Sequence, residues 1–171
     1  MQDITTSVKG SSASALAALI QKLNTPWKMR LYFFRLLPSC WFWGVRVKAC
    51  SADRAVVDIP YNWRSQNPFR STYFAALAGA AELSTGLMAL IAVQGLGRMS
   101  MLITGLEMRY YRKARGHTTF TCEAGPAIRE AVRRAIESGI GQEVRVHTTG
   151  SSADGEVVCE AWFTWSFKQK A

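Results

Sequence analysis

One carboxylate interrupts the longest apolar segment of this chain. The stretch NPFRSTYFAALAGAAELSTG, residues 67–86, places Glu82 inside a run that carries almost no other charge. The pattern predicts a helix over about 72–94, ended by Gly95 and Gly97, with apolar residues on every side. Because an unpaired buried charge costs several kcal/mol, Glu82 must find a partner, bind a proton or have a chemical role.

Two segments are apolar enough to be compared with membrane spans, and neither is predicted to cross a bilayer. Residues 28–47 are interrupted by spaced charges and by Pro38, so they lack the roughly twenty apolar residues that a span needs. Residues 73–96 are long enough, but Glu82 lies near their centre and they are rich in Ala and Gly. This composition favours a helix enclosed by protein.

The length of 171 residues fits a single domain that can bury a core without disulfides or metals. A hydrophobic content of 49% and an aromatic content of 11% are typical of an ordered globular protein. The four cysteines show no CxxC spacing, so we expect reduced thiols in the core rather than disulfides or a zinc site. They are Cys40, Cys50, Cys122 and Cys159.

Basic residues outnumber acidic ones, 21 to 12, which gives a net charge of +9. This balance favours a polyanionic partner: nucleic acid, an anionic membrane or a phosphorylated small molecule. Because the basic residues are spread along the chain without a helix-turn-helix or stacking motif, nucleic acid ranks lowest and we expect none. The N-terminus MQDITTSVKGSSASA lacks the basic start and apolar stretch of a secretory signal, which favours a cytoplasmic location.

The periodicity of the chain predicts strands joined mostly by hairpins, with helices before and between them. We therefore expect an α+β protein in which an antiparallel sheet packs on one long hydrophobic helix. An N-terminal helical extension, residues 1–40, is expected to pack on a single domain formed by residues 41–171. The dense aromatic residues of 26–43 fit a core, an acyl-chain pocket or a subunit contact. Residues 1–12 are expected to fray. Before the long helix, the predicted elements are helices over 13–23 and 26–37 and a hairpin within 44–63. After it, they are strands within 99–114 and 117–124, a helix over 126–138 and a hairpin within 143–169.

This architecture resembles the hotdog fold, in which an antiparallel sheet wraps around a central helix and two protomers join their sheets edge to edge. The segment 67–82 is similar to the helix motif of hotdog acyl-CoA thioesterases of the phenylacetate-degradation type: an Asn, six residues later a His followed by two Gly, and nine residues after that His an Asp or Glu. Asn67 and Glu82 keep this spacing, and Tyr73 takes the place of the His. Phe74 and Ala75 replace the glycine pair, which normally lets a substrate approach the backbone closely. The segments GVRV and SADRAVVDIPYN look most like a little-characterised branch of the hotdog family that is labelled as thioesterases.

Thioester hydrolysis needs a group that activates water and donors that hold the negative charge on the carbonyl oxygen. The N–H groups of Phe74 and Ala75, in the first turn of the long helix, lack intrahelical acceptors and can form such an oxyanion hole. Glu82 lies roughly 11 to 12 Å further along the helix, at about 1.5 Å per residue. The resemblance implies a homodimer with antiparallel central helices, so that Glu82 of one protomer, as general base or nucleophile, faces the helix start of the other. Whether such dimers assemble further stays open.

Several of these residues have both a functional and a structural interpretation. Glu82 can act in catalysis, or can be a buried acid that satisfies a hydroxyl of Ser84, of Thr85 or of a tyrosine. Asn67 can orient the water or the carbonyl, or can be an ordinary turn residue. Tyr73 can donate a hydrogen bond to the thioester, or can simply pack.

The basic group Arg112, Lys113 and Arg115 suits the phosphates of coenzyme A, or is a solvated hairpin end. The two histidines, His117 and His147, are expected to be structural. No metal-binding constellation is apparent in the sequence.

The sequence thus predicts an acyl-CoA thioesterase that needs no metal and no cofactor other than the coenzyme A of its substrate. The alternative is a non-catalytic acyl-CoA or fatty-acid binding protein on the same scaffold. In that case the replaced glycines close the oxyanion site and Glu82 is structural.

Overall fold

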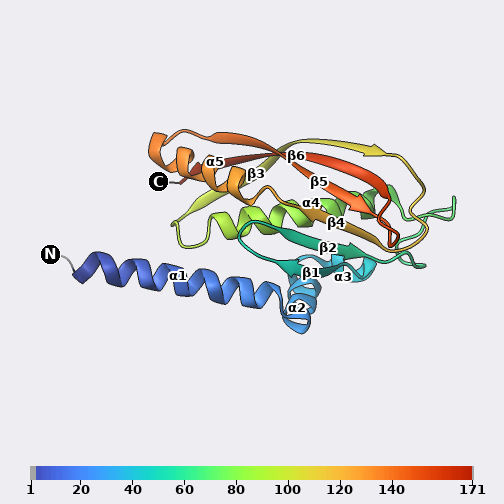
Figure 1. Ribbon diagram of the computed structural model, residues 1–171, viewed down its shortest axis with the longest axis horizontal. Coiled ribbons are helices and arrows are strands. Elements are labelled where there is room, and N and C mark those ends of the chain that lie inside the picture. Colours follow the sequence, from blue (N-terminus) through green and yellow to red (C-terminus); the bar gives the residue numbers. More distant parts are fainter. Residues whose placement is uncertain (1–2, 171) are drawn as a thin grey trace.

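The computed structural model describes residues 3–170 of the chain. Three helices precede the first strand, one long helix lies between the second and third strands, and one helix separates the fourth strand from the fifth (Figure 1). The elements are α1 (Asp3–Leu23), α2 (Pro26–Leu36), α3 (Pro38–Trp43), β1 (Arg46–Cys50), β2 (Ala55–Ile59), α4 (Phe74–Ala92), β3 (Met99–Tyr110), β4 (Thr118–Cys122), α5 (Gly125–Ser138), β5 (Gln142–Ser151) and β6 (Val157–Gln169).

The strands form one six-stranded antiparallel sheet in the order β1-β2-β4-β5-β6-β3. β3 and β6 pair along nearly their whole length, from Met99 opposite Gln169 to Tyr110 opposite Cys159. The helix α4 packs against β2, β4, β5 and β6, and α5 covers the sheet beside it (Figure 1). This is the hotdog fold, as the sequence predicted.

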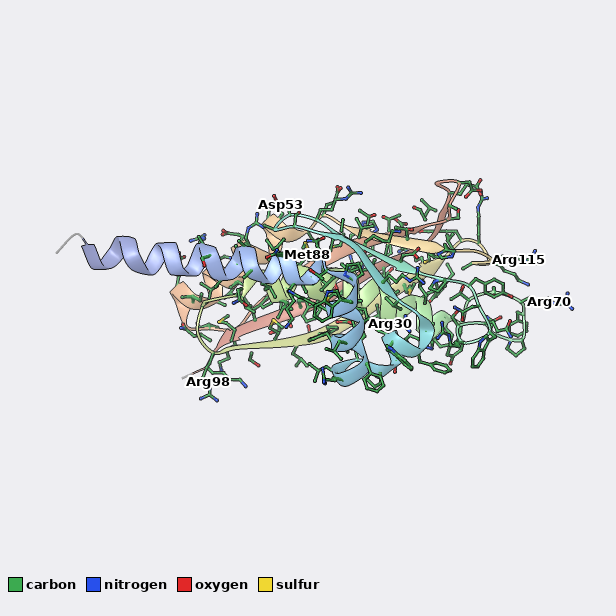
Figure 2. All side chains as sticks on the ribbon, turned by 90° about the horizontal axis from the view of Figure 1, so that it is seen from below. Arg30, Asp53, Arg70, Met88, Arg98 and Arg115 are labelled. Carbon is green, nitrogen blue, oxygen red and sulfur yellow. The ribbon has the colours of Figure 1, made fainter. Side chains whose placement is uncertain are left out.

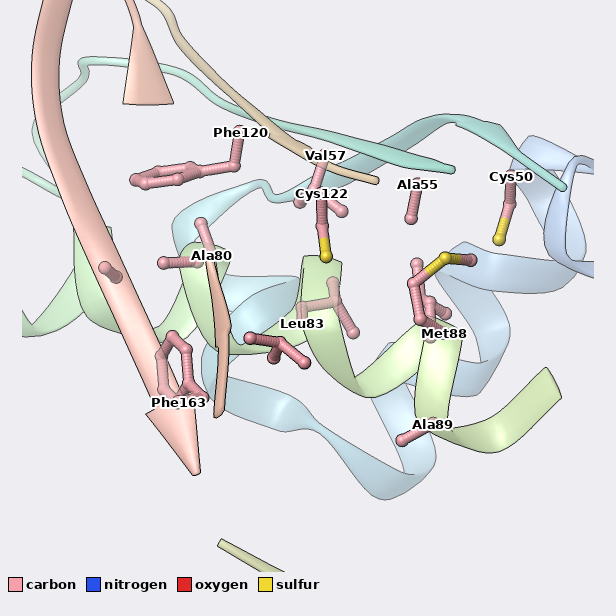
Figure 3. Packing of buried hydrophobic residues seen from close by; sticks show 14 of the residues in the cluster. Cys50, Ala55, Val57, Ala80, Leu83, Met88, Ala89, Phe120, Cys122 and Phe163 are labelled. Atoms are coloured by element: carbon pink, nitrogen blue, oxygen red, sulfur yellow. The ribbon is translucent and has the colours of Figure 1, made fainter. Parts of the chain in front are cut away.

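The helix α4 is buried because small and aliphatic side chains line it. Ala76, Ala80 and Ala81 have no exposed surface, so the helix backbone lies close to its neighbours. Figure 3 shows Ala80 and Leu83 of α4 in one cluster with aromatic side chains of the strands. α4 is long and apolar enough to cross a membrane, but most of it is buried inside the protein, as expected for a core helix.

Two polar contacts join α4 to the sheet inside this apolar core. The hydroxyls of Ser84 and Thr148 lie 2.8 Å apart, and Ser84 also donates to the carbonyl of Ala81. The indole N–H of Trp165 donates to the hydroxyl oxygen of Thr85 at 3.1 Å. Because buried polar groups are costly when unpaired, these contacts fix how the helix sits on the strands.

Thr85→Val is expected to lower the free energy of unfolding by about 1–3 kcal/mol. Valine has nearly the shape of threonine but leaves the buried indole N–H of Trp165 without an acceptor. Thr85→Ser keeps the hydroxyl and serves as the matched control, which should lose less stability. Urea denaturation followed by Trp fluorescence measures both values, and equal losses in the two variants would contradict this role of the hydroxyl.

The N-terminal helices differ from the prediction in two places. The helix α1 begins at Asp3, although residues 1–12 were expected to fray. No proline interrupts this segment, and Gly10 alone costs a helix only about 1 kcal/mol. The helix α3 was not predicted: Pro38 ends α2, as expected, but also occupies the first turn of a new helix. The bend between them lies at Leu37, with φ −136° and ψ 63°.

The amphipathic pattern of the first helix is confirmed. Leu23 is buried, and Leu16, Leu19 and Ile20 pack against the common core. The four cysteines are also buried, with free thiols. Burial raises the pKa of Cys50 to about 11, so that thiol stays protonated at neutral pH.

Candidate active site

The first turn of α4 presents two unpaired backbone donors. Its N-cap, Tyr73, has an extended backbone with φ −62° and ψ 133°, and its side chain does not cap the helix. The carbonyl of Tyr73 accepts from the N–H groups of Ala76, at 3.0 Å, and of Leu77, at 3.1 Å. Within residues 3–170, no acceptor lies in range of the N–H groups of Phe74 and Ala75. These donors lie at the positive end of the helix dipole.

A cavity of about 340 Å³ adjoins this helix start. Its lining combines the helix residues Phe74 and Leu77 with Tyr110 at the end of β3. It brings together four of the predicted site residues, Asn67, Phe74, Arg112 and Lys113. The other predicted residues lie outside its lining; they are Tyr73, Ala75, Glu82 and Arg115.

Asn67 organises the loop that leads into α4. Its side-chain oxygen, Oδ1, accepts hydrogen bonds from the N–H of Phe69, at 2.9 Å, and from the N–H and hydroxyl of Ser71, both at 3.3 Å. This loop includes Arg70, whose φ of +58° is unusual for a residue other than glycine. Thr72 then fastens the loop to the carbonyl of Ala114 through its N–H at 2.8 Å and its hydroxyl at 3.2 Å. Asn67 thereby shapes one wall of the cavity, in keeping with the turn interpretation.

Two tyrosines at the end of β3 border the cavity and were not among the predicted site residues. The hydroxyl of Tyr110 lies 3.4 Å from the carbonyl of Phe74, and partial burial raises the pKa of Tyr110 to about 12. Tyr111 donates to Glu160 at 2.6 Å. The paired aromatic residues in YYRKA were a signal of this wall, but their position beside the helix start depends on how β3 ends. Tyr73 packs edge-on against Phe74, with ring centroids 4.9 Å apart.

The three predicted coenzyme A-binding cations, Arg112, Lys113 and Arg115, differ in their ion pairing. Arg112, just after β3, forms an ion pair with Glu156, just before the neighbouring strand β6, which reduces the charge that it can offer to a ligand. Lys113 and Arg115 are exposed and have no carboxylate within ion-pair distance in the described chain. Arg115 lies at the same end of the molecule as Arg70 (Figure 2).

Glu82 is half-buried, and its carboxylate has no hydrogen-bond partner among residues 3–170. The hydroxyl of Ser84 bonds to Ala81 and Thr148, whereas that of Thr85 donates to the backbone carbonyl of Glu82. The structural alternative, in which a neighbouring hydroxyl satisfies the carboxylate, is therefore not found for these two residues. Removal from water raises the pKa of Glu82 above its ordinary value.

Two glycines leave space on the face of α4 that carries Glu82. A Cβ atom at Gly86 would lie 3.0 Å from Glu82 Oε1, and one at Gly79 would lie 2.9 Å from the Trp43 ring. On the same side, the buried thiol of Cys40 has its pKa raised to about 11 by burial and, secondarily, by the negative charge of Glu82. Glycines at i−3 and i+4 from an acid were a sequence signal of this arrangement.

Both histidines lie beside carboxylates, and neither lines the cavity at the start of α4. His117 Nδ1 lies 3.0 Å from the buried Asp58, and His147 Nε2 lies 2.9 Å from Glu160. His147 also stacks on Trp162, with ring centroids 4.8 Å apart. In the described residues, no three His, Cys, Asp or Glu side chains lie close enough together to hold a metal ion.

In a comparison with protein families, the model "Domain of unknown function (DUF4442)" matches residues 26–167. The chain belongs to this family. The matched region includes the whole sheet from β1 to most of β6, and it also includes α2 and α3. No curated protein matches the sequence significantly.

Solved structures share the hotdog fold of this family member at low sequence identity. A protein of unknown function from Pseudomonas aeruginosa, described as a probable thioesterase, has a TM-score of 0.69 and 19% identity, covering 85% of this chain and 97% of its own. A protein of unknown function from Chlorobaculum tepidum has a TM-score of 0.70 and 14% identity, with 85% and 98% covered. A variant of a thioesterase from Pseudomonas aeruginosa has a TM-score of 0.63 and 16% identity, with 87% and 93% covered.

Proposed function

We propose that this protein hydrolyses acyl-CoA thioesters. The observation that carries the proposal is the pair of unpaired N–H groups, those of Phe74 and Ala75, at a helix start beside a cavity. The half-buried carboxylate of Glu82, which lacks a hydrogen-bond partner in the described chain, supplies a base. The fold shared with structures described as thioesterases supports the same reaction class.

In the proposed reaction, Glu82 takes a proton from water, and the water oxygen attacks the thioester carbon. The carbonyl oxygen then carries a negative charge and accepts hydrogen bonds from the N–H groups of Phe74 and Ala75. The C–S bond breaks, and the coenzyme A thiolate takes the proton from the Glu82 carboxyl group. The products are a free carboxylic acid and coenzyme A as a thiol. The phosphates of coenzyme A are proposed to bind to Arg112, Lys113 and Arg115.

The proposal requires a second copy of the chain. Eight residues separate Phe74 from Glu82, which corresponds to roughly 12 Å along one helix. β3 is an edge strand with exposed Leu102 and Leu106, so a dimer joined at β3 would cover both a free strand edge and apolar side chains. With two antiparallel copies of α4, Glu82 of one protomer acts at the helix start of its partner.

The direct test is release of free thiol from a panel of short, long and aromatic acyl-CoA esters. Hydrolysis of at least one ester in proportion to protein concentration supports the proposal. The alternative, a non-catalytic acyl-CoA or fatty-acid binding protein, is favoured by the side chain of Phe74, which lines the cavity where a glycine would leave space. Saturable binding of the esters without any release of thiol would decide for this alternative.

The pH dependence of kcat/KM should report the ionisation of Glu82. A general base works only when ionised, and burial raises the pKa of this group. Activity is therefore expected to be full well above the raised pKa and to fall as the pH decreases through it. The midpoint should lie above the ordinary pKa of glutamate, measured at constant ionic strength. A midpoint at or below that ordinary value would contradict the role of this half-buried acid.

A further inference from the structure

The exposed side of α2 is apolar at helical spacing. Trp27, Leu31 and Phe34 follow each other at i, i+4 and i+7, so they share one face, and they are 66%, 42% and 58% exposed. The opposite face carries Met29 and Phe33, which are buried in the core. α2 therefore has one apolar stripe that the fold covers and a second that faces solvent.

A cavity of about 480 Å³ opens between α2 and β1 beside this exposed stripe. We call it the basic cavity, because no Asp or Glu is among its lining residues. The side chain of Trp27 forms part of its wall, and Figure 2 shows Arg30 on α2. Its cations are Arg30, Arg46, Lys48 and Arg64.

The charge of the basic cavity is not neutralised by the fold. None of its four cations lies within ion-pair distance of a carboxylate in the part of the chain that the structure describes. The sequence contains no acidic residue between Asp3 and Asp53, whereas α2 adds two more cations, Lys28 and Arg35. This end of the molecule thus combines unpaired positive charge with exposed aromatic and aliphatic surface.

We propose that α2 and the basic cavity form a docking surface for an anionic phospholipid bilayer. A helix with Trp, Phe and Leu on one side and cations beside them fits the boundary between headgroups and acyl chains. In the docked state, Trp27, Leu31 and Phe34 enter this boundary, and the cations of the basic cavity hold lipid phosphates.

Other occupants match only part of this surface. A nucleic acid would neutralise the cations, and its bases could stack on Trp27, but Leu31 would stay in water. A second copy of the chain would have to bring carboxylates to the basic cavity and apolar residues to the stripe. A bilayer supplies both chemistries over the whole surface.

Sedimentation with lipid vesicles tests the proposal on the intact chain. We expect binding to phosphatidylcholine vesicles that contain phosphatidylglycerol, weaker binding as salt is added, and little binding to phosphatidylcholine alone. Arg30→Gln combined with Lys48→Gln should weaken binding about thirtyfold, since each cation near an anionic surface contributes about fivefold. The matched control, Lys168→Gln with Lys170→Gln, removes the same charge from exposed positions near the opposite edge of the sheet from β1 and should bind almost as well as the native chain.

The apolar stripe has its own test. Trp27→Ala with Phe34→Ala should weaken vesicle binding at least tenfold, because two large side chains no longer enter the bilayer. Ile140→Ala, at another exposed apolar residue, is the control and should change little. Unchanged melting temperatures would show that all these exposed variants fold.

Several results would overturn the proposal. One is equal binding to neutral and anionic vesicles, and another is no binding even at low salt. A third is that the native chain binds no vesicles, whereas the Trp27→Ala, Phe34→Ala variant still binds an oligonucleotide as tightly as the native chain does. A change of oligomeric state in that variant, without vesicle binding by the native chain, would assign the surface to a second copy. None of these outcomes depends on whether the chain hydrolyses thioesters.

Discussion

Glu82→Gln is expected to lower kcat for acyl-CoA hydrolysis by about 10²–10⁴, the contribution typical of a positioned general base. Glutamine keeps the size of the side chain but cannot take the proton from water. The readout is thiol release at saturating acyl-CoA, with the ester that the native chain hydrolyses fastest. The same change on the exposed face of α5, Glu137→Gln, is the control and should leave activity unchanged. Equal activity of Glu82→Gln and the native chain would remove Glu82 from the mechanism.

The same variant also makes a prediction about stability. Because burial raises the pKa of Glu82, the folded chain binds its proton more tightly than the unfolded chain does. The cost of ionising this group is therefore absent below the unfolded-state pKa and appears as the pH rises through the folded-state pKa. At neutral pH, Glu82→Gln removes that cost, so the melting temperature should stay equal or increase. A large decrease would instead indicate that the carboxylate has a structural partner.

Phe74→Pro is expected to lower kcat by about 10²–10³ relative to Phe74→Ala, the cost of one lost oxyanion donor. Proline removes the N–H at the first helical position, where a helix tolerates proline best. The preceding residue, Tyr73, already has the extended backbone that a following proline requires. Comparison with Phe74→Ala separates loss of the N–H from loss of the side chain that lines the cavity. Equal kcat values in the two variants would exclude this N–H as an oxyanion donor.

Mixing the two inactive variants tests whether the site spans two protomers. If the proposed dimer forms, about half of the dimers contain one Glu82→Gln chain and one Phe74→Pro chain after the variants are unfolded and refolded together. If each site combines Glu82 of one protomer with the helix start of the other, one site in each mixed dimer is intact. About a quarter of the native activity should then return. A site within one protomer would give no recovery.

The fold was predictable because its largest element is chemically unusual. A helix with apolar residues on every side has to be enclosed, and the surrounding strands show alternating patterns that specify an antiparallel sheet. Pro126 and Gly139 likewise marked the ends of α5 closely, since proline suits a first helical turn and Gly139 adopts a left-handed C-cap. The helix α3 escaped prediction because Pro38 fits both the end of one helix and the beginning of the next.

The candidate site was predictable only where it is local in sequence. The N–H groups of Phe74 and Ala75 follow from the position of the helix start, and among residues 3–170 no acceptor lies in range of them. Tyr110 comes to the same cavity from β3, and this contact depends on long-range pairing that no short motif encodes. The carboxylate of Glu82 was identified as an exception to the apolar pattern, but its lack of a hydrogen-bond partner among the described residues depends on where the hydroxyls of Ser84 and Thr85 point.

The buried, protonated cysteines bear on how these experiments can be performed. Cys50, Cys122 and Cys159 lie in strands, and burial raises the pKa of each, to about 12 for Cys159. Disulfide reagents attack thiolates, so the folded chain should consume such a reagent slowly while coenzyme A reacts at once. If the disulfide reagent releases a coloured thiol, the colour that forms without substrate measures how often the sheet opens and exposes these cysteines. The same reagent can therefore follow both turnover and unfolding.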